Sequence, residues 1–254
     1  MIKEITSSKN KTVCELKKLK QKKYREQSGR FLSEGYRNVC DSMSKQAPRM
    51  LLIENNFSEP VHLPQAAEIY RVTDTVLREI CDTQTPQGIA AVFDIPKEKE
   101  LTSSSVLLLN GVADPGNLGT ILRTALASGF TDIILDENCA DVYAPKVVRS
   151  ALSAIFSLNL IRVKNLVDSV FSLQEQGYRV YGAALCENAC SVYDTEFPEK
   201  TALMMGSEAN GISEELLGKL DGVYIIPMNP EIESLNVAVA AGISMYEVNR
   251  RKKR

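Results

Sequence analysis

Five polar residues stand out because each comes shortly after an apolar run of the kind that forms a buried strand. Together they offer a guanidinium, a carboxylate, a hydroxyl and two carboxamides, groups that can orient a substrate and stabilise developing negative charge. They are Asn117 and Arg123 in GVADPGNLGTILR, Glu208 in GSEANGIS, and Ser234 and Asn236 in NPEIESLN. Each stretch alone is also compatible with a tight turn or with capping of the next helix, so the prediction of a site depends on all three together.

Several other kinds of chemistry lack their usual residues. GVADPGNLG has neither the G-x-G-x-x-G spacing of dinucleotide-binding loops nor the G-x-x-x-x-G-K-[ST] spacing of phosphate-binding loops. The only histidine, His62, lies in the polar stretch SEPVHLPQ and is expected at the surface, which disfavours Ser-His-Asp and Cys-His catalysis. The six cysteines are scattered without a CxxC pair, so we expect reduced thiols and no metal site.

The net charge of −2 conceals a strong asymmetry along the chain. Residues 1–30 contain ten Lys and Arg against three Glu, a local charge of +7, and the final RRKKR adds five more positive charges. Residues 31–249 therefore carry −14. A basic arm on an acidic body favours binding to a phosphate backbone over general polycation behaviour.

The order of apolar and polar runs predicts an α/β protein. In residues 1–96 a helix capped by Ser7 or Ser8 is followed by alternating strands and helices. KEKELTSSS, residues 97–105, is charged and then rich in serine, as linkers are. In residues 106–254 six apolar runs alternate with helical patterns, which indicates a parallel sheet buried on both faces. Ligands of such sheets bind at the carboxyl ends of the strands, where we expect the five polar residues to lie.

Taken together, DPGNLGTILRTA, MGSEANGIS and IPMNPEIESLNVAVAAGISMYE resemble the three motifs of the SpoU/TrmH family of RNA ribose 2′-O-methyltransferases, within the SPOUT superfamily. The resemblance covers about residues 106–249 in order, spacing and strand context. Residues 1–96 resemble the family's L30e-like substrate-binding domain through RFLSEGYRNVCDSM and TQTPQGIAAVF. The resemblance implies a SPOUT parallel sheet with a deep trefoil knot, a homodimer, and S-adenosyl-L-methionine as the cofactor.

Residue by residue, the resemblance assigns the catalytic roles to the five polar residues. It places the cofactor against the second and third motifs and the end of the preceding strand, at Gly206, Ile226, Met228, Leu235, Ala183 and Leu185. The segment KVVRSALSAIF departs from the Arg-Ala-Ser-x-Gly of many relatives, but Arg149 within it remains an expected RNA contact. The other expected RNA contacts are Lys9, Lys11, Lys17 and Lys18.

The resemblance implies methylation of a ribose 2′-hydroxyl in structured RNA, with 23S rRNA favoured as the substrate. A tRNA 2′-O-methyltransferase and a non-catalytic RNA-binding or ribosome assembly factor with the same fold stay open as alternatives. A SPOUT enzyme that methylates bases is disfavoured, because those branches lack the spacing from Asn117 to Arg123. The sequence has no apolar run long enough to span a bilayer and no signal-peptide core at its N-terminus, so a cytoplasmic protein without a membrane partner is expected.

Overall fold

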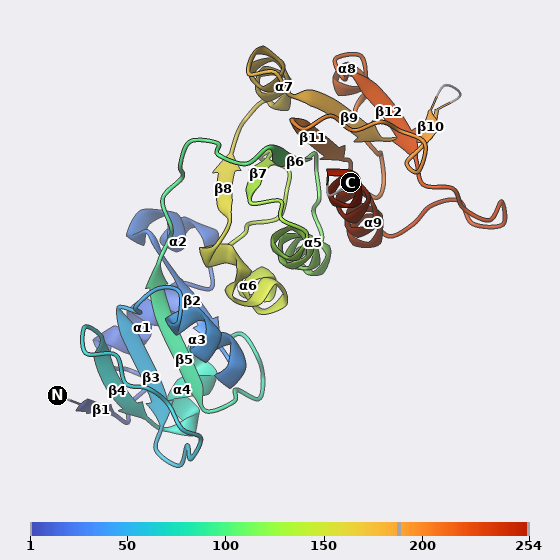
Figure 1. Ribbon diagram of the computed structural model, residues 1–254. Helices are drawn as coiled ribbons and strands as arrows, with labels where there is room; N and C mark the ends of the chain where they lie inside the picture. The colour runs from blue at the N-terminus through green and yellow to red at the C-terminus, as the bar shows by residue number, and fades with distance from the viewer. Residues whose placement is uncertain (1, 187–188, 253–254) are drawn as a thin grey trace. The chain divides into compact units, whose positions relative to one another are not determined.

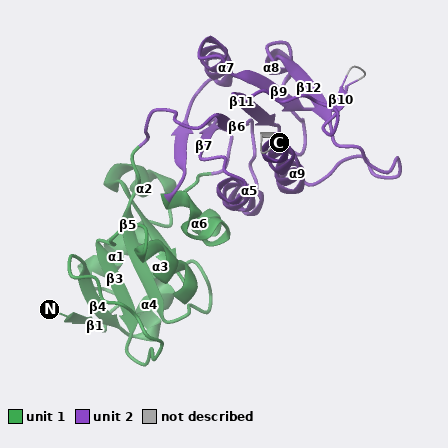
Figure 2. Cartoon of the chain, in the orientation of Figure 1, with its two compact units in different colours: residues 1–97, 141–156 green, residues 98–140, 157–254 purple. Residues whose placement is uncertain are grey.

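The computed structural model describes residues 2–186 and 189–252, which form two compact units (Figures 1 and 2). The first unit comprises residues 1–97 and 141–156, and the second comprises residues 98–140 and 157–254. The expected division into domains 1–96 and 106–254 with a linker at 97–105 stays a prediction. The units defined by packing differ from it, because a segment from the middle of the second half packs with the first.

The first unit is built on a five-stranded mixed sheet of strand order β1-β4-β3-β5-β2. Strands β1, β4 and β3 are parallel, and β5 is antiparallel to both β3 and β2. The strands are β1 (Ile2–Ile5), β2 (Arg30–Glu34), β3 (Met50–Glu54), β4 (Glu68–Val72) and β5 (Ile89–Asp94). The four apolar strands of this set match the predicted runs. Strand β1 was not predicted, because it is a short edge strand whose first three residues are exposed.

Two groups of helices cover the two faces of this sheet. On one face, α1 and α4 contribute Val13, Leu16 and Leu77 to a core that also contains Leu32 of β2. On the other face, Phe31 of β2 contacts aromatic rings from residues 141–156, as the alternation of side chains along a strand requires. The helices are α1 (Lys11–Lys18), α2 (Lys22–Ser28), α3 (Tyr36–Met43), α4 (Asp74–Ile80), α6 (Pro145–Ala151) and the 3₁₀ helix η1 (Leu152–Phe156).

The N-terminal helix differs from the prediction in its start and its length. Asn10 caps α1, because its side chain accepts a hydrogen bond from the N–H of Thr12 at 2.9 Å. Ser7 and Ser8, the predicted caps, lie before it in a turn. The expected single helix is also divided into α1 and α2 by residues 19–21. Most of the basic residues of this region therefore lie on two short helices joined by a turn, and we call this segment, residues 11–28, the α1–α2 hairpin.

The second unit is built on a seven-stranded sheet of strand order β10-β12-β9-β11-β6-β7-β8, in which all the pairs are parallel. The strands are β6 (Ser105–Leu109), β7 (Asp132–Leu135), β8 (Asn159–Arg162), β9 (Arg179–Ala183), β10 (Cys190–Ser191), β11 (Thr201–Met205) and β12 (Gly222–Ile225). The helices are α5 (Pro115–Ala127), α7 (Leu166–Glu175), α8 (Glu214–Leu217) and α9 (Val237–Lys252). The six predicted apolar runs all form strands, so the predicted α/β fold class is confirmed; β10 is additional.

The strand order places a topological switch between β6 and β11. From β6 the chain proceeds outward to β7 and β8, whereas β11 leads in the opposite direction to β12. Ligands of parallel α/β sheets bind at such a point, outside the carboxyl ends of the strands. The first motif follows β6, the second follows β11 and the third follows β12. The topology therefore brings the three motifs to one edge of one sheet (Figure 1).

No helix within residues 2–186 and 189–252 is both long enough and apolar enough to cross a bilayer.

Candidate active site

Three of the five polar residues form a continuous chain of side-chain hydrogen bonds. Asn117 donates from Nδ2 to the carboxylate of Glu208 and accepts at Oδ1 from Nδ2 of Asn236, at 3.0 Å. The partners are 91 and 119 residues away in the sequence. The direction of these hydrogen bonds follows from the chemistry of the groups, because a carboxylate can only accept a hydrogen bond. Asn117 therefore links the second motif to the third.

Asn236 has a second role that fixes its orientation. Its Oδ1 accepts hydrogen bonds from the backbone N–H groups of Ala238 and Val239, at 3.0 and 3.3 Å, so the residue caps α9 as the sequence suggested. With Oδ1 committed to the helix, Nδ2 is the group that faces Asn117. The side chain of Asn236 thus accepts hydrogen bonds from the N–H groups at the start of α9 and also donates one to Asn117 of the first motif.

The start of α5 positions Asn117. Asp114 caps the helix by accepting the N–H of Asn117 at 2.8 Å, and Pro115 occupies the first turn, where a missing N–H costs nothing. Asn117 and Gly116 therefore lie inside the helix, and not in the tight turn with which this stretch is also compatible. The turn that needs glycine is at Gly111, whose φ is +70°.

Arg123 lies apart from the other motif residues. At about 100° per residue it is about 240° round the helix from Asn117, and its side chain is exposed. Among the described residues it has no hydrogen-bond or ion-pair partner. The structure thus brings together Asn117, Glu208 and Asn236, but not Arg123.

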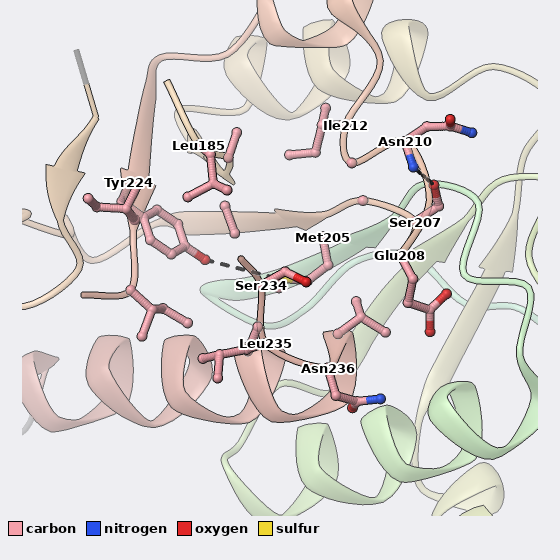
Figure 3. Close-up of a pocket in the computed structure, with 18 of the residues that line it drawn as sticks. Leu185, Met205, Ser207, Glu208, Asn210, Ile212, Tyr224, Ser234, Leu235 and Asn236 are labelled. Carbon is pink, nitrogen blue, oxygen red and sulfur yellow. Dashed lines mark hydrogen bonds between the residues drawn. The ribbon is translucent and has the colours of Figure 1, made fainter. Parts of the chain in front are cut away.

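A pocket of about 480 Å³ opens beside this hydrogen-bonded chain, between the ends of β9, β11 and β12 and the start of α9 (Figure 3). We call it the switch-point pocket. Glu208, Ser234 and Asn236 of the predicted catalytic set line it, as do all six residues expected to hold the cofactor. The lining residues are Ala183, Ala184, Leu185, Met205, Gly206, Ser207, Glu208, Asn210, Gly211, Ile212, Leu217, Tyr224, Ile225, Ile226, Met228, Ser234, Leu235, Asn236, Val237 and Ala240.

Gly206 allows two loops of the pocket to approach closely. A Cβ atom at this position would lie 2.1 Å from the backbone carbon of Gly211, a distance that no side chain tolerates. The approach is fixed by paired backbone hydrogen bonds between Ser207 and Gly211, at 3.1 and 2.9 Å. At Gly206 the wall of the pocket is therefore backbone rather than side chain.

The part of the pocket next to β11 and β12 is apolar. Tyr224 is fully buried, and burial raises the pKa of its hydroxyl above the ordinary value. The hydroxyl lies 3.9 Å from Sδ of Met205; Figure 3 shows both side chains at the pocket. Leu185 at the rim is exposed over 70% of its surface. An apolar region with a polar rim suits a ligand that has both an apolar and a charged part.

A buried carboxylate that the sequence analysis missed holds the loops in place. Asp136, directly after β7, accepts hydrogen bonds from Nδ2 of Asn110 and from the N–H groups of Gly111, Asn138 and Cys139, at 2.8–3.1 Å. Asn110 in turn accepts at Oδ1 from the N–H of Ser213 in the second motif, at 3.3 Å. Asp136 and Asn110 each stand directly after a buried strand, and this position was the signal in the sequence that could have identified them.

The residues expected to contact RNA differ in their surroundings. Lys9, Lys11 and Lys18 are without a carboxylate partner within the described ranges, whereas Lys17 forms an ion pair with Glu79. Arg149 forms ion pairs with Glu34 and Asp82 inside the first unit. An RNA phosphate would therefore compete with protein carboxylates at Lys17 and Arg149.

The basic C-terminus is partly engaged as well. Glu247 is 7% exposed and forms ion pairs with Arg250 and Arg251. Arg251 also donates to the backbone carbonyl of Tyr193. Lys253 and Arg254 of the RRKKR sequence lie outside the described residues.

The cysteines are free thiols, as expected. Burial raises the pKa of the Cys139 thiol to about 12, which keeps it protonated. No group of three His, Cys, Asp or Glu side chains in the described part of the chain could hold a metal ion.

Comparison with known proteins gives concordant results for both halves of the chain. A sequence model of the SpoU rRNA methylase family matches residues 104–246, and a model of an MRM3-like substrate binding domain matches residues 10–91. The chain is 37% identical to the 23S rRNA (guanosine(2553)-2′-O)-methyltransferase RlmP of Bacillus subtilis over 248 residues, which cover 97% of this chain and 99% of that protein.

Solved structures give the same result. The AdoMet-bound rRNA methyltransferase of Sinorhizobium meliloti is 26% identical, with a TM-score of 0.83 and 98% of each chain covered. The SpoU methyltransferase AviRb of Streptomyces viridochromogenes in complex with AdoMet is 27% identical, with a TM-score of 0.82 and 96% of this chain and 99% of that one covered.

Proposed function

Because the chain belongs to the SpoU rRNA methylase family, we propose that it transfers a methyl group from S-adenosyl-L-methionine to a ribose 2′-hydroxyl of 23S ribosomal RNA. The observation that carries the proposal is the hydrogen-bonded chain through Asn117, Glu208 and Asn236 at the rim of the switch-point pocket. Three separate segments of sequence must converge to make it. A fold kept only for packing would not need these polar groups together at a strand edge.

The switch-point pocket suits S-adenosyl-L-methionine in size and in chemistry. Its apolar part next to β11 and β12 can take the adenine ring, and backbone groups near Gly206, Ile226 and Met228 are available to the polar edges of the nucleoside. The close approach at Gly206 leaves the loop backbone exposed to a ligand. When bound, the cofactor supplies an electrophilic methyl group on a positively charged sulfur.

The protein must then orient a weak nucleophile. A ribose hydroxyl reacts slowly unless its proton is removed or its developing charge is stabilised. A guanidinium keeps its proton in water and is a poor base, so we assign Arg123 the role of stabilising the alkoxide or anchoring a neighbouring phosphate. Asn117, Ser234 and Asn236 shape the rim that holds the hydroxyl, and Glu208 fixes the amide of Asn117.

We propose a homodimer formed through α9 and α5. The two helices pack together, and Gly242 lies within 3.4 Å of Thr124 when a Cβ is placed on it. On their outer surface Val239 and Tyr246 of α9 are 51% and 52% exposed, and aromatic side chains of this kind are enriched at interfaces. Arg123 is exposed on α5, so a second copy could receive it at its pocket. The trefoil knot also stays a prediction. Because the proposed substrate is ribosomal RNA, we propose that the protein acts in the cytoplasm.

Two experiments test the function. Mapping of 2′-O-methylated sites in the rRNA and tRNA of a deletion strain and its parent identifies the substrate; loss of one site in 23S rRNA is expected. Loss of a tRNA site instead would favour the tRNA alternative. Isothermal titration with S-adenosyl-L-methionine tests the non-catalytic alternative, because a protein that retained only the fold would show no binding.

A further inference from the structure

A second cavity lies in the first unit, which contains none of the three motifs. It has a volume of about 280 Å³ and opens between the α1–α2 hairpin and the sheet. Leu16, Leu19, Met50 and Val92 provide apolar walls, and Tyr24 of α2 contributes an aromatic ring. We call it the hairpin cavity. Its volume is below the range of about 300–1,000 Å³ typical of drug-sized ligands, which suits a single planar ring system.

The polar groups of the hairpin cavity are those that read a base edge. Gln27 offers an amide donor and an acceptor, Thr12 and Ser28 each offer a hydroxyl, and Glu15 offers a carboxylate. Arg30 also lines the cavity, and its guanidinium is paired with Asp94. Lys18 also lines the cavity, but the carboxylate of Glu15, the pairing of Arg30 with Asp94 and the four apolar side chains disfavour a free anion there. The chemistry therefore indicates a heterocycle with both donors and acceptors.

The surroundings of the hairpin cavity supply positive charge. Lys18 lines the cavity and its Nζ lies 5.6 Å from the centre of the Tyr24 ring. Lys9, Lys11, Lys20 and Lys23 are exposed nearby in the sequence, and none of the five forms an ion pair with a described residue. Charges left without protein partners are available to the phosphates of a nucleic acid.

We propose that the hairpin cavity binds one unstacked base of the substrate RNA, with Tyr24 as the stacking surface and the hairpin lysines on the flanking phosphates. The inference rests on the proposed function, since it takes RNA as the substrate, and it adds a specific point of base recognition in a different unit from the three motifs. Sequence-specific recognition of RNA commonly uses unstacked bases held on aromatic side chains. The cavity thus contributes to the choice of target site.

The absence of tryptophan from the chain makes a clean test possible. Tyr24→Trp places a single indole at the cavity, and stacking of a base quenches its fluorescence. The matched control is Phe171→Trp on α7, because Phe171 is 47% exposed and Nζ of Lys219 lies 5.6 Å from its ring. The control indole therefore has the same cationic neighbour without the cavity. The probes are an octaribonucleotide of mixed sequence and an abasic ribose-phosphate octamer of equal charge.

The octaribonucleotide is expected to quench the Tyr24→Trp protein, and the abasic octamer is not; the control protein responds to neither. Tyr24→Ala is expected to weaken binding of the octaribonucleotide about tenfold, within the range for loss of one base–aromatic stack. Equal quenching by both probes would mean binding through phosphates alone and would overturn the proposal, as would no quenching at all.

Titration of the Tyr24→Trp protein with S-adenosyl-L-methionine, together with an rRNA methylation assay, separates this proposal from the proposed function. Cofactor binding and methylation without quenching overturn only the base-binding cavity. Quenching without cofactor binding overturns only the methyltransferase.

Discussion

Asn236 donates from Nδ2 to Oδ1 of Asn117 at 3.0 Å, although 119 residues separate the two along the chain. Each of these amides has its other end committed, Asn236 to the first N–H groups of α9 and Asn117 to Glu208. Rotation of either amide by 180° would place two donors or two acceptors together. The rim of the switch-point pocket is therefore held in one arrangement before any ligand binds.

Exchange of the hydrogen-bond donor between Asn117 and Glu208 tests whether their hydrogen bond is important for methyl transfer. Asn117→Asp preserves the shape but removes the donor to Glu208 and places two carboxylates side by side, so we expect methyl transfer to fall about 100-fold. Glu208→Gln in the same protein returns a donor and should recover most of the loss. The rate of single-turnover methylation of an rRNA fragment is compared among the natural protein, the two single variants and the double variant, as a double-mutant cycle. Additive losses in the double variant would show that the hydrogen bond between these residues has no role in the reaction.

The sequence was sufficient to predict the strands and the edge of the sheet where the motifs meet, because runs such as VLLL and TALMM are buried on both faces. It could not predict the partners of Asn117, since hydrogen bonds across 91 and 119 residues depend on tertiary structure. Its capping residues were correct for α9, where Asn236 stands directly before an apolar helix. For α1 the pattern offered several polar residues, and the prediction chose Ser7 or Ser8 whereas Asn10 is the cap.

Arg123 is expected to act only when it reaches the pocket of a second copy. Arg123→Ala and Asn236→Ala should each abolish most methyl transfer, whereas a mixture of the two inactive proteins, unfolded and refolded together, should regain activity. Mixed dimers would contain one pocket with both residues intact. Sedimentation of each variant checks that dimers form. If the mixture stays inactive although mixed dimers are present, Arg123 serves the pocket of its own chain.

Gly206→Ala is expected to destroy the pocket wall. The added Cβ would lie 2.1 Å from the backbone of Gly211, so one of the two loops must move. Gly218→Ala is the control, because its Cβ would meet nothing closer than 3.7 Å and its φ is −68°. Isothermal titration should show loss of S-adenosyl-L-methionine binding for Gly206→Ala and normal binding for Gly218→Ala. Equal affinity in the two variants would contradict the placement of the cofactor beside Gly206.

Asp136 is expected to be important for stability. Its carboxylate is 4% exposed and receives four hydrogen bonds, so Asp136→Ala leaves buried donors without an acceptor at a cost of about 3 kcal/mol in the free energy of unfolding. Asp94→Ala removes a carboxylate that is 39% exposed and paired with arginines, and should cost at most about 1 kcal/mol. Urea unfolding of both variants provides the comparison.

The ion pairs of Glu247 with Arg250 and Arg251 are expected to make the stability of the protein depend on pH. Hydrogen bonds from Arg250 and Arg251 hold the pKa of this carboxyl below its usual value near 4.5, against the effect of burial. Above that usual value the group is ionised in both the folded and the unfolded chain, so the ion pairs contribute fully. As the pH falls below it, the unfolded chain binds the proton first, and the contribution is lost as the pH reaches the lowered pKa. Glu247→Gln should therefore be less stable than the natural chain at pH 7, and the difference in unfolding free energy should shrink as the pH falls below 4.5 toward the lowered pKa. Glu175→Gln, which alters an exposed carboxyl on α7, controls for the loss of one negative charge. A difference for Glu247→Gln that stays constant across this range would mean that the arginines do not stabilise the ionised carboxyl.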